Sequence, residues 1–156
     1  MLLITGATGV VGSHVVRALL ERDAPVRVFA RDPDKARGLF GRHVDVAVGD
    51  FAEPATFRAA LAGVDRVFLS CADHPLRVGW ERDAIDEAVD AGVSRVVKLS
   101  AIGAAPGARV AFWDWHGQVE EHLRAAPVPS VILRSGPFMF HGKMPCAPLR
   151  AGCAPS

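Results

Sequence analysis

The amino-terminal glycine turn is the feature that most limits how this chain can fold. A short apolar run, Leu2-Leu3-Ile4-Thr5, leads directly into Gly6-Ala7-Thr8-Gly9-Val10-Val11-Gly12, and apolar residues at helical spacing continue to Leu20. A strand that ends in a G-x-x-G-x-x-G turn and opens into a helix is typical of a pyrophosphate site, although glycine turns also occur in proteins that bind nothing. Here the flanking strand and helix patterns favour a nucleotide cradle. Its predicted contact residues are Gly6, Thr8, Gly9, Val10, Val11 and Gly12.

Strand-like and helix-like segments alternate along the chain. The expected strands are residues 2–5, 26–30, 44–48, 67–70, 95–100 and 129–133. The expected helices are residues 10–20, 33–40, 54–61, 78–91 and 110–125. Strands separated by helices of this length need right-handed parallel crossovers. We therefore predict an α/β, three-layer, doubly wound Rossmann fold with a six-stranded parallel sheet of order 3-2-1-4-5-6.

The regular pattern ends after Leu133, so we expect one domain at residues 1–140 and an irregular tail at residues 141–156. The charged residues make up 22% of the chain, are scattered and leave a net charge of +1, which disfavours nucleic acid and a membrane surface as partners. No apolar run approaches the roughly 20 residues that cross a bilayer. Three cysteines without metal-ligand spacing predict no metal site and a cytoplasmic location.

The residue after the second strand indicates which dinucleotide the cradle takes. At this position an acidic residue binds the 2′-hydroxyl of NAD, whereas an arginine accepts the 2′-phosphate of NADP. This chain has Arg31 there and Lys35 one helical turn later. Because arginine forms paired charge-assisted bonds to phosphate, we predict NADP(H). NAD(H) stays an alternative since Asp32 is a competing ribose ligand, but we assign Asp32 to capping the helix that Pro33 begins. An Arg31 that is merely solvated is the other interpretation.

Other candidates follow the remaining strands, whose carboxyl ends meet at one edge of the sheet. Asp50 suits the amino group of adenine and Phe51 suits the face of its ring. A capping role for Asp50 and core packing of Phe51 are equally consistent with the pattern. The remaining predicted cofactor contacts are Cys71, Ala72, Ser100 and Arg134.

Five motifs together resemble the NmrA-like branch of the atypical short-chain dehydrogenases/reductases. They are the glycine turn from Thr5, Ala30-Arg31-Asp32-Pro33-Asp34-Lys35, Gly49-Asp50, the run Val96-Val97-Lys98-Leu99-Ser100-Ala101-Ile102-Gly103-Ala104, and Ile132-Leu133-Arg134-Ser135-Gly136-Pro137-Phe138-Met139. The resemblance covers residues 1–140. It implies an NAD(P)-binding Rossmann domain, often with a preference for NADPH, in reductases of quinones or other small molecules or in redox-sensing regulators.

The chain departs from this resemblance at the usual catalytic pair. Short-chain dehydrogenases use a tyrosine as general acid and a lysine four residues later, but this chain contains no tyrosine. Alignment with the family's helix puts Phe112 at the tyrosine position and His116 at the lysine position. Phenylalanine cannot donate a proton, which excludes carbonyl reduction by that pair. Hydride transfer to a quinone-like acceptor does not need it, because water can supply the protons.

Two residues are candidates for any acid that the reaction needs. His116 is the first, because an unperturbed histidine titrates near pH ~6.5, and Ser100 is a weaker one. A histidine with an ordinary hydrogen bond and a serine that caps backbone groups are the competing interpretations.

The resemblance also implies a smaller region beyond the sixth strand that closes over the substrate. We expect this region to be absent, because the chain ends at Ser156. Uncovered apolar residues such as Phe138, Met139 and Phe140 then favour a homodimer or another protein partner. Our leading hypothesis is an NAD(P)H-dependent reductase of a quinone-like or other small acceptor. The alternatives are a non-catalytic NADP sensor that binds a protein partner, and a truncated relative that keeps only cofactor binding.

Overall fold

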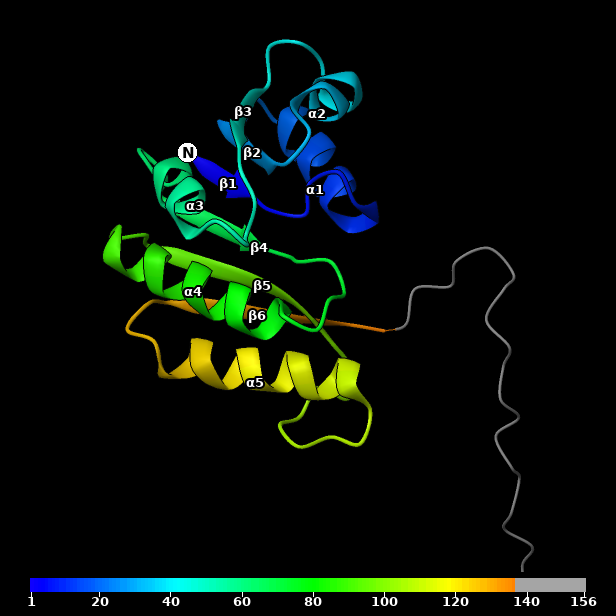
Figure 1. Cartoon of the computed structure of the whole chain (residues 1–156). Coiled ribbons are helices and arrows are strands. Elements are labelled where there is room, and N and C mark those ends of the chain that lie inside the picture. Colours follow the sequence, from blue (N-terminus) through cyan, green and yellow to red (C-terminus); the bar gives the residue numbers. More distant parts are fainter. Residues whose placement is uncertain (137–156) are drawn as a thin grey trace, which may run out of the picture.

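The computed structural model describes residues 1–136, which form one six-stranded parallel sheet with helices on both faces (Figure 1). The strands are β1 (Leu2–Ile4), β2 (Val26–Ala30), β3 (Asp45–Val48), β4 (Arg66–Leu69), β5 (Arg95–Ala101) and β6 (Ser130–Ser135). The helices are α1 (Val10–Leu20), α2 (Pro33–Phe40), α3 (Pro54–Ala60), α4 (Arg77–Asp90) and α5 (Ala111–Ala125). The strand order β3-β2-β1-β4-β5-β6 confirms the predicted fold class. The predicted tail and the apolar residues 138–140 lie outside the described residues.

The two faces of the sheet have separate hydrophobic cores, because successive side chains of a strand point to opposite faces. Leu3 and Phe29 pack with residues of α3, α4 and α5, including Phe57 of α3. Ile4, one residue after Leu3, and Val28, one residue before Phe29, pack with residues of α1 and α2. In Figure 1, α3, α4 and α5 accordingly lie on one side of the sheet, while α1 and α2 lie on the other.

Local sequence signals account for most element boundaries. The carboxylate of Asp32 accepts a hydrogen bond from the N–H of Lys35 at 2.9 Å, and Pro33 occupies the first turn of α2. This confirms that Asp32 caps the helix. The sixth strand is longer than predicted and reaches Ser135, because Arg134 and Ser135 pair with the end of β5. Pairing with a neighbouring strand extends β6 beyond its apolar run.

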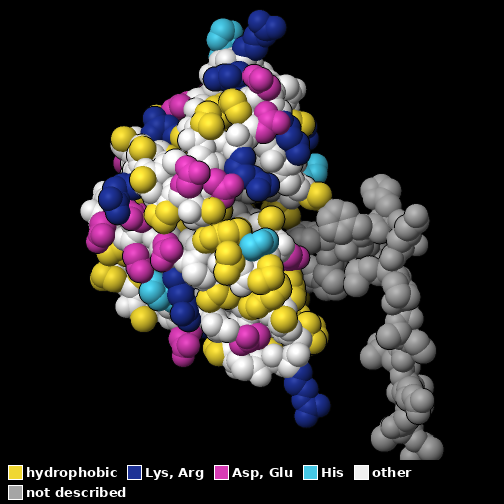
Figure 2. All heavy atoms as spheres, viewed as in Figure 1, with side chains coloured by type: hydrophobic (Ala, Val, Ile, Leu, Met, Phe, Trp, Pro, Cys, Tyr) yellow, Lys and Arg dark blue, Asp and Glu magenta, His cyan; other side chains and the backbone are white. Residues whose placement is uncertain are grey.

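The described part of the chain contains no helix that is long and apolar enough to cross a membrane. On the face shown in Figure 2, Lys and Arg side chains are interspersed with Asp and Glu side chains. A continuous basic surface is the usual footprint of nucleic-acid binding. The mixture of charges gives this face no such surface (Figure 2).

Gly117 allows α5 to approach the loop that follows β5. A Cβ atom at Gly117 would lie 2.2 Å from the carbonyl carbon of Ala105, whereas a Cβ atom at Gly38 of α2 would meet no atom within 4 Å. Both glycines lie inside helices, so they form a matched pair in which only the first is close to a neighbouring backbone.

We predict that Gly117→Ala lowers the free energy of unfolding by about 3 kcal/mol, because the added methyl group forces α5 away from the loop. Gly38→Ala should leave it unchanged or raise it by up to about 1 kcal/mol through the helix propensity of alanine. Urea unfolding followed by circular dichroism measures both. Equal effects of the two substitutions would contradict the role of this close contact.

Candidate functional site

The glycine turn joins β1 to α1 with very little space between its backbone segments. Gly6 has a φ of 59°, in the left-handed region that favours glycine. A Cβ atom at Gly12 would lie 2.2 Å from the carbonyl oxygen of Gly6, so the helix could not pack on the turn with any other residue. Within the described chain, no side chain caps the start of α1 at Gly9. The first N–H groups of α1 are therefore available to an anion.

The hydroxyl of Thr5 connects the turn to the end of β4. It accepts a hydrogen bond from the N–H of Ser70 at 2.8 Å and donates one to the carbonyl oxygen of Ser70 at 2.9 Å. Because β1 and β4 are adjacent strands whose connections run in opposite directions, a crevice opens here at the carboxyl edge of the sheet. The two cavities described below lie along this crevice.

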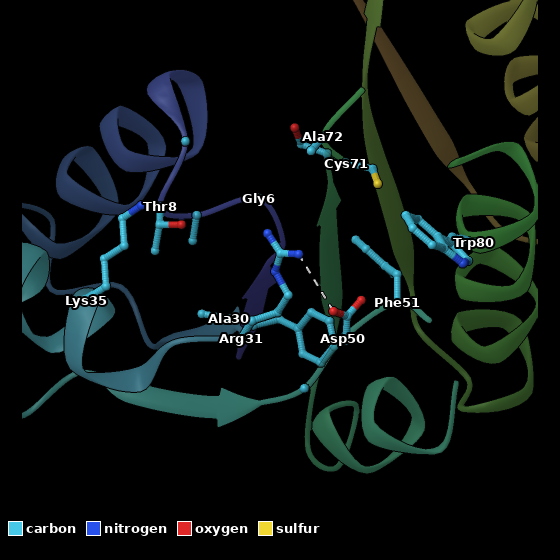
Figure 3. A pocket seen from close by; sticks show the side chains of 15 residues that line it. Gly6, Thr8, Ala30, Arg31, Lys35, Asp50, Phe51, Cys71, Ala72 and Trp80 are labelled. Carbon is cyan, nitrogen blue, oxygen red and sulfur yellow. Dashed lines mark ion pairs between the residues drawn. The ribbon is translucent and has the colours of Figure 1, made fainter. Parts of the chain in front are cut away.

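The first cavity has a volume of about 360 Å³ and extends from the glycine turn to α4 (Figure 3). The predicted contact residues that line it are Gly6, Thr8, Gly9, Arg31, Lys35, Asp50, Phe51, Cys71 and Ala72. They come from four different strand ends, so the fold brings together residues far apart in the sequence. Trp80 of α4 also lines this cavity, and the sequence analysis did not select it.

The second cavity, of about 260 Å³, lies at the start of α1 and shares Gly6, Gly9, Ser70, Cys71 and Ala72 with the first. The predicted residues that line only this cavity are Val10, Val11, Gly12, Ser100 and His116. Phe112, which we aligned with the family's tyrosine, also lines it. A ligand that spans both cavities would therefore cross the glycine turn.

Asp50 and Phe51 each make a structural contact and also line the first cavity, so both interpretations of the sequence apply to them. One carboxylate oxygen of Asp50 accepts the N–H of Ala52 at 3.0 Å, which is a structural turn contact, while the other lies 3.8 Å from the guanidinium of Arg31. The ring of Phe51 lies 5.5 Å from that of Phe29, centroid to centroid, and packs against the core. Both residues nevertheless keep a surface on the first cavity.

Arg134 is the predicted contact residue that the structure does not bring to either cavity. Its guanidinium donates to the two carboxylate oxygens of Glu120 at 2.9 and 2.5 Å and to the carbonyl oxygen of Ala104 at 3.3 Å. Burial raises the pKa of Glu120, but hydrogen bonds from Arg134, Ser100 and Arg124 outweigh it and lower the pKa to about 2. Arg134 thus pairs with a buried carboxylate and lines neither cavity, and its contact with a cofactor stays a prediction.

Three charged side chains that the sequence analysis missed lie buried behind the cavities. Glu81 of α4 lies 3.2 Å from the guanidinium of Arg77 and 2.8 Å from the ammonium group of Lys98 on β5. Arg77 also pairs with Asp73 at 2.6 Å. Asp73 lies in the loop before α4 and lines the second cavity. Two signals in the sequence point to this cluster: a lysine inside the apolar strand at residues 96–99, and an Arg–Glu pair at helical spacing of four.

His116 is neutral at pH 7, which removes the reason for choosing it as an acid. Burial, followed by the positive charges of Lys98 and Arg77, lowers its pKa to about 3. Its ring packs edge-on against that of Phe112 with centroids 4.7 Å apart, and its Nδ1 atom has no hydrogen-bond partner among residues 1–136. Ser100 is also unsuited as an acid, because its hydroxyl donates to Glu120 at 2.6 Å.

These features fit a dinucleotide. The glycine turn leaves a space that a Cβ atom would fill, free helix N–H groups face it, and an unpaired histidine nitrogen lies in the adjoining cavity. Within residues 1–136 no three His, Cys, Asp or Glu side chains come together as they would around a metal ion.

Comparison with known proteins agrees with this geometry. Residues 6–143 match the family described as NAD(P)H-binding. The chain belongs to this NAD(P)H-binding family. It is related to atypical, NmrA-like members of the short-chain dehydrogenases/reductases, which include quinone oxidoreductases and azoreductases. The predicted family and its nicotinamide dinucleotide cofactor are confirmed at this level.

Two curated relatives and one solved structure illustrate the relationship. The chain is 39% identical to the NAD(P)H azoreductase of Xenophilus azovorans over 89% of its own length and 49% of that protein. It is 30% identical to quinone oxidoreductase 2 of Escherichia coli K12 over 87% of its length and 48% of that protein. The crystal structure of an NADPH-dependent quinone oxidoreductase from Escherichia coli in complex with NADPH matches with a TM-score of 0.74 and 29% identity, over 86% of this chain and 48% of that one. The chain thus spans about half the length of these relatives.

The low pKa of His116 makes folding stability depend on pH. The unfolded chain takes up a proton on this ring near pH 6.5, whereas the folded chain does so only near pH 3. Between these values the unfolded state binds more protons, so stability is lost as the pH falls. We predict that, because of this residue, the free energy of unfolding is about 2 kcal/mol lower at pH 5 than at pH 7.

Urea unfolding of the wild type and of His116→Phe at both pH values measures this contribution. The variant should lose about 2 kcal/mol less than the wild type on acidification, because phenylalanine does not titrate. Equal losses in the two proteins would show that His116 does not hold this depressed pKa.

Proposed function

We propose that this chain binds NADPH across the two cavities and serves in the reduction of a quinone-like acceptor. The observation that carries the proposal is the position of Arg31 and Lys35 on the cavity that the glycine turn borders (Figure 3). The side chain of Arg31 is 78% exposed and its guanidinium lies 3.8 Å from the carboxylate of Asp50, so the two do not form a close ion pair. It is free to form paired bonds with a 2′-phosphate.

Each part of the site has a task in this proposal. The turn and the N–H groups of α1 hold the diphosphate, and Arg31 and Lys35 bind the 2′-phosphate. The second cavity, between Gly12 and Phe112, receives the nicotinamide end. When bound, the reduced nicotinamide supplies a hydride to an acceptor. Phe112 gives this end an apolar wall, while the neutral His116 offers a hydrogen bond without a charge.

The protons of such a reduction would come from water. Neither residue that the sequence offers as an acid suits this task, because Ser100 donates to Glu120 and His116 is neutral at pH 7. An acceptor that takes a hydride before it takes a proton, as a quinone can, is the class that tolerates this arrangement.

The lack of a tyrosine acid favours a second candidate, a non-catalytic NADP sensor. Phe112 stands where the resemblance places a tyrosine acid, and a protein that only senses the nucleotide needs no proton donor. In this case the bound dinucleotide would change the affinity for a protein partner instead of reducing an acceptor.

Arg31→Ala should weaken NADPH binding at least tenfold, because it removes charge-assisted bonds to the 2′-phosphate. NADH binding should change less than twofold, since NADH has a hydroxyl at this position. Isothermal titration calorimetry with both nucleotides measures the difference. Arg22 follows α1 and lines neither cavity, so Arg22→Ala is the matched control and should bind both nucleotides like the wild type. Equal losses for NADPH and NADH would contradict the cofactor assignment.

The purified chain should oxidise NADPH when a small quinone is added, with decay of the NADPH fluorescence as the signal. A panel of benzoquinones and naphthoquinones, with NADPH alone as the blank, tests the acceptor class. Tight NADPH binding without turnover of any quinone would overturn the reductase and leave the sensor. A chain that binds neither nucleotide would overturn both.

A further inference from the structure

The first cavity ends in an aromatic wall that the phosphate-binding residues do not explain. Phe51 follows β3 and Trp80 belongs to α4, and both line this cavity as well as a small hollow behind it. Figure 3 shows the two side chains next to each other, across the cavity from Lys35. The cavity therefore has one side suited to anions and one suited to a flat ring.

The indole of Trp80 is held in place by its neighbours. It stacks on the imidazole of His74 with ring centroids 4.5 Å apart and an angle of 14° between the planes. Nδ1 of His74 in turn accepts the N–H of Leu76 at 3.1 Å, which fixes that ring. The same turn of α4 is anchored by the buried Arg77–Glu81 pair. A wall fixed in this way loses little conformational entropy when a ligand binds.

The charges around the wall define which ring it suits. Asp50 lines the same cavity and offers a carboxylate oxygen that faces Arg31 at 3.8 Å, which is long for a hydrogen bond. This oxygen can accept a hydrogen bond from an exocyclic amino group. An aromatic wall beside an acceptor matches an aminopurine, and in a dinucleotide the adenine lies beside the ribose that Arg31 would read.

We propose that Trp80 is a specificity-determining residue of the nucleotide site, and that its indole packs against the adenine ring beside Phe51. Trp80 thereby favours dinucleotides with a purine base at this end and contributes affinity that the phosphate-binding residues do not supply. This inference rests on the proposed binding of NADPH in the first cavity.

Tryptophan fluorescence gives a direct readout of this contact. The chain contains 3 tryptophans, and Trp113 and Trp115 line neither cavity. In the double variant Trp113→Phe/Trp115→Phe, Trp80 is the sole tryptophan. Titration with 2′,5′-ADP, which carries the adenine and the 2′-phosphate but no nicotinamide, should quench its fluorescence in a saturable way.

Affinity provides the second readout. Trp80→Leu should bind 2′,5′-ADP about tenfold more weakly by calorimetry, Trp80→Phe should keep most of the affinity because it keeps a flat ring, and Trp113→Leu should match the wild type. Thermal unfolding of each variant shows whether it is folded. The quenching experiment keeps the indole and so does not depend on the stability of Trp80→Leu.

The possible outcomes separate this inference from the function on which it rests. If the wild type binds NADPH and 2′,5′-ADP, but Trp80 is not quenched and Trp80→Leu binds normally, the role of Trp80 is wrong and NADPH binding stands. If the wild type binds neither NADPH nor 2′,5′-ADP, the proposed function fails and the inference fails with it.

Discussion

The hydrogen bonds of Thr5 to Ser70 are the contact on which the site depends most. They hold the ends of β1 and β4 together at the place where the strand order reverses. A Cβ atom at Gly6 would lie 2.8 Å from the carbonyl oxygen of Ser70, so the turn after β1 passes directly over the end of β4. Both cavities include Gly6 and Ser70 among their lining residues. The crevice therefore has a fixed floor, and the loops around it supply the residues that could contact a ligand.

A buried charge cluster sets the electrostatics of that crevice. Arg77, Glu81 and Lys98 are almost completely inaccessible to solvent, and burial lowers the pKa of Lys98 while Glu81 opposes the shift. Burying charges is costly unless they are paired. Here the pairing requires that α4, which carries Glu81, stays packed against β5, which carries Lys98. Burial, with the charge of Glu81 as the next cause, also raises the pKa of Cys71 to about 11. Its thiol is therefore protonated at pH 7 and is not a nucleophile.

Much of the fold could be predicted from local patterns, because hydrophobic periodicity and helix punctuation are encoded in short segments. Asp32-Pro33 marks the start of α2, and the alternation of strands and helices implies the parallel sheet. The end of β6 was predicted two residues early, since Arg134 and Ser135 join the strand only through their partners on β5. Most of the candidate site was also predictable, because parallel strands bring their carboxyl ends to one edge.

The sequence by itself determined the glycine turn, the nucleotide cradle and the position of Arg31 after β2, since each depends on residues close together in the chain. Only the tertiary structure decided that Arg134 serves Glu120, that His116 is neutral and that Trp80 reaches the first cavity. The physical reason is the same in all three. Ion pairing, desolvation and the lining of a cavity depend on groups that come from distant elements, and no local pattern specifies which of these groups will meet.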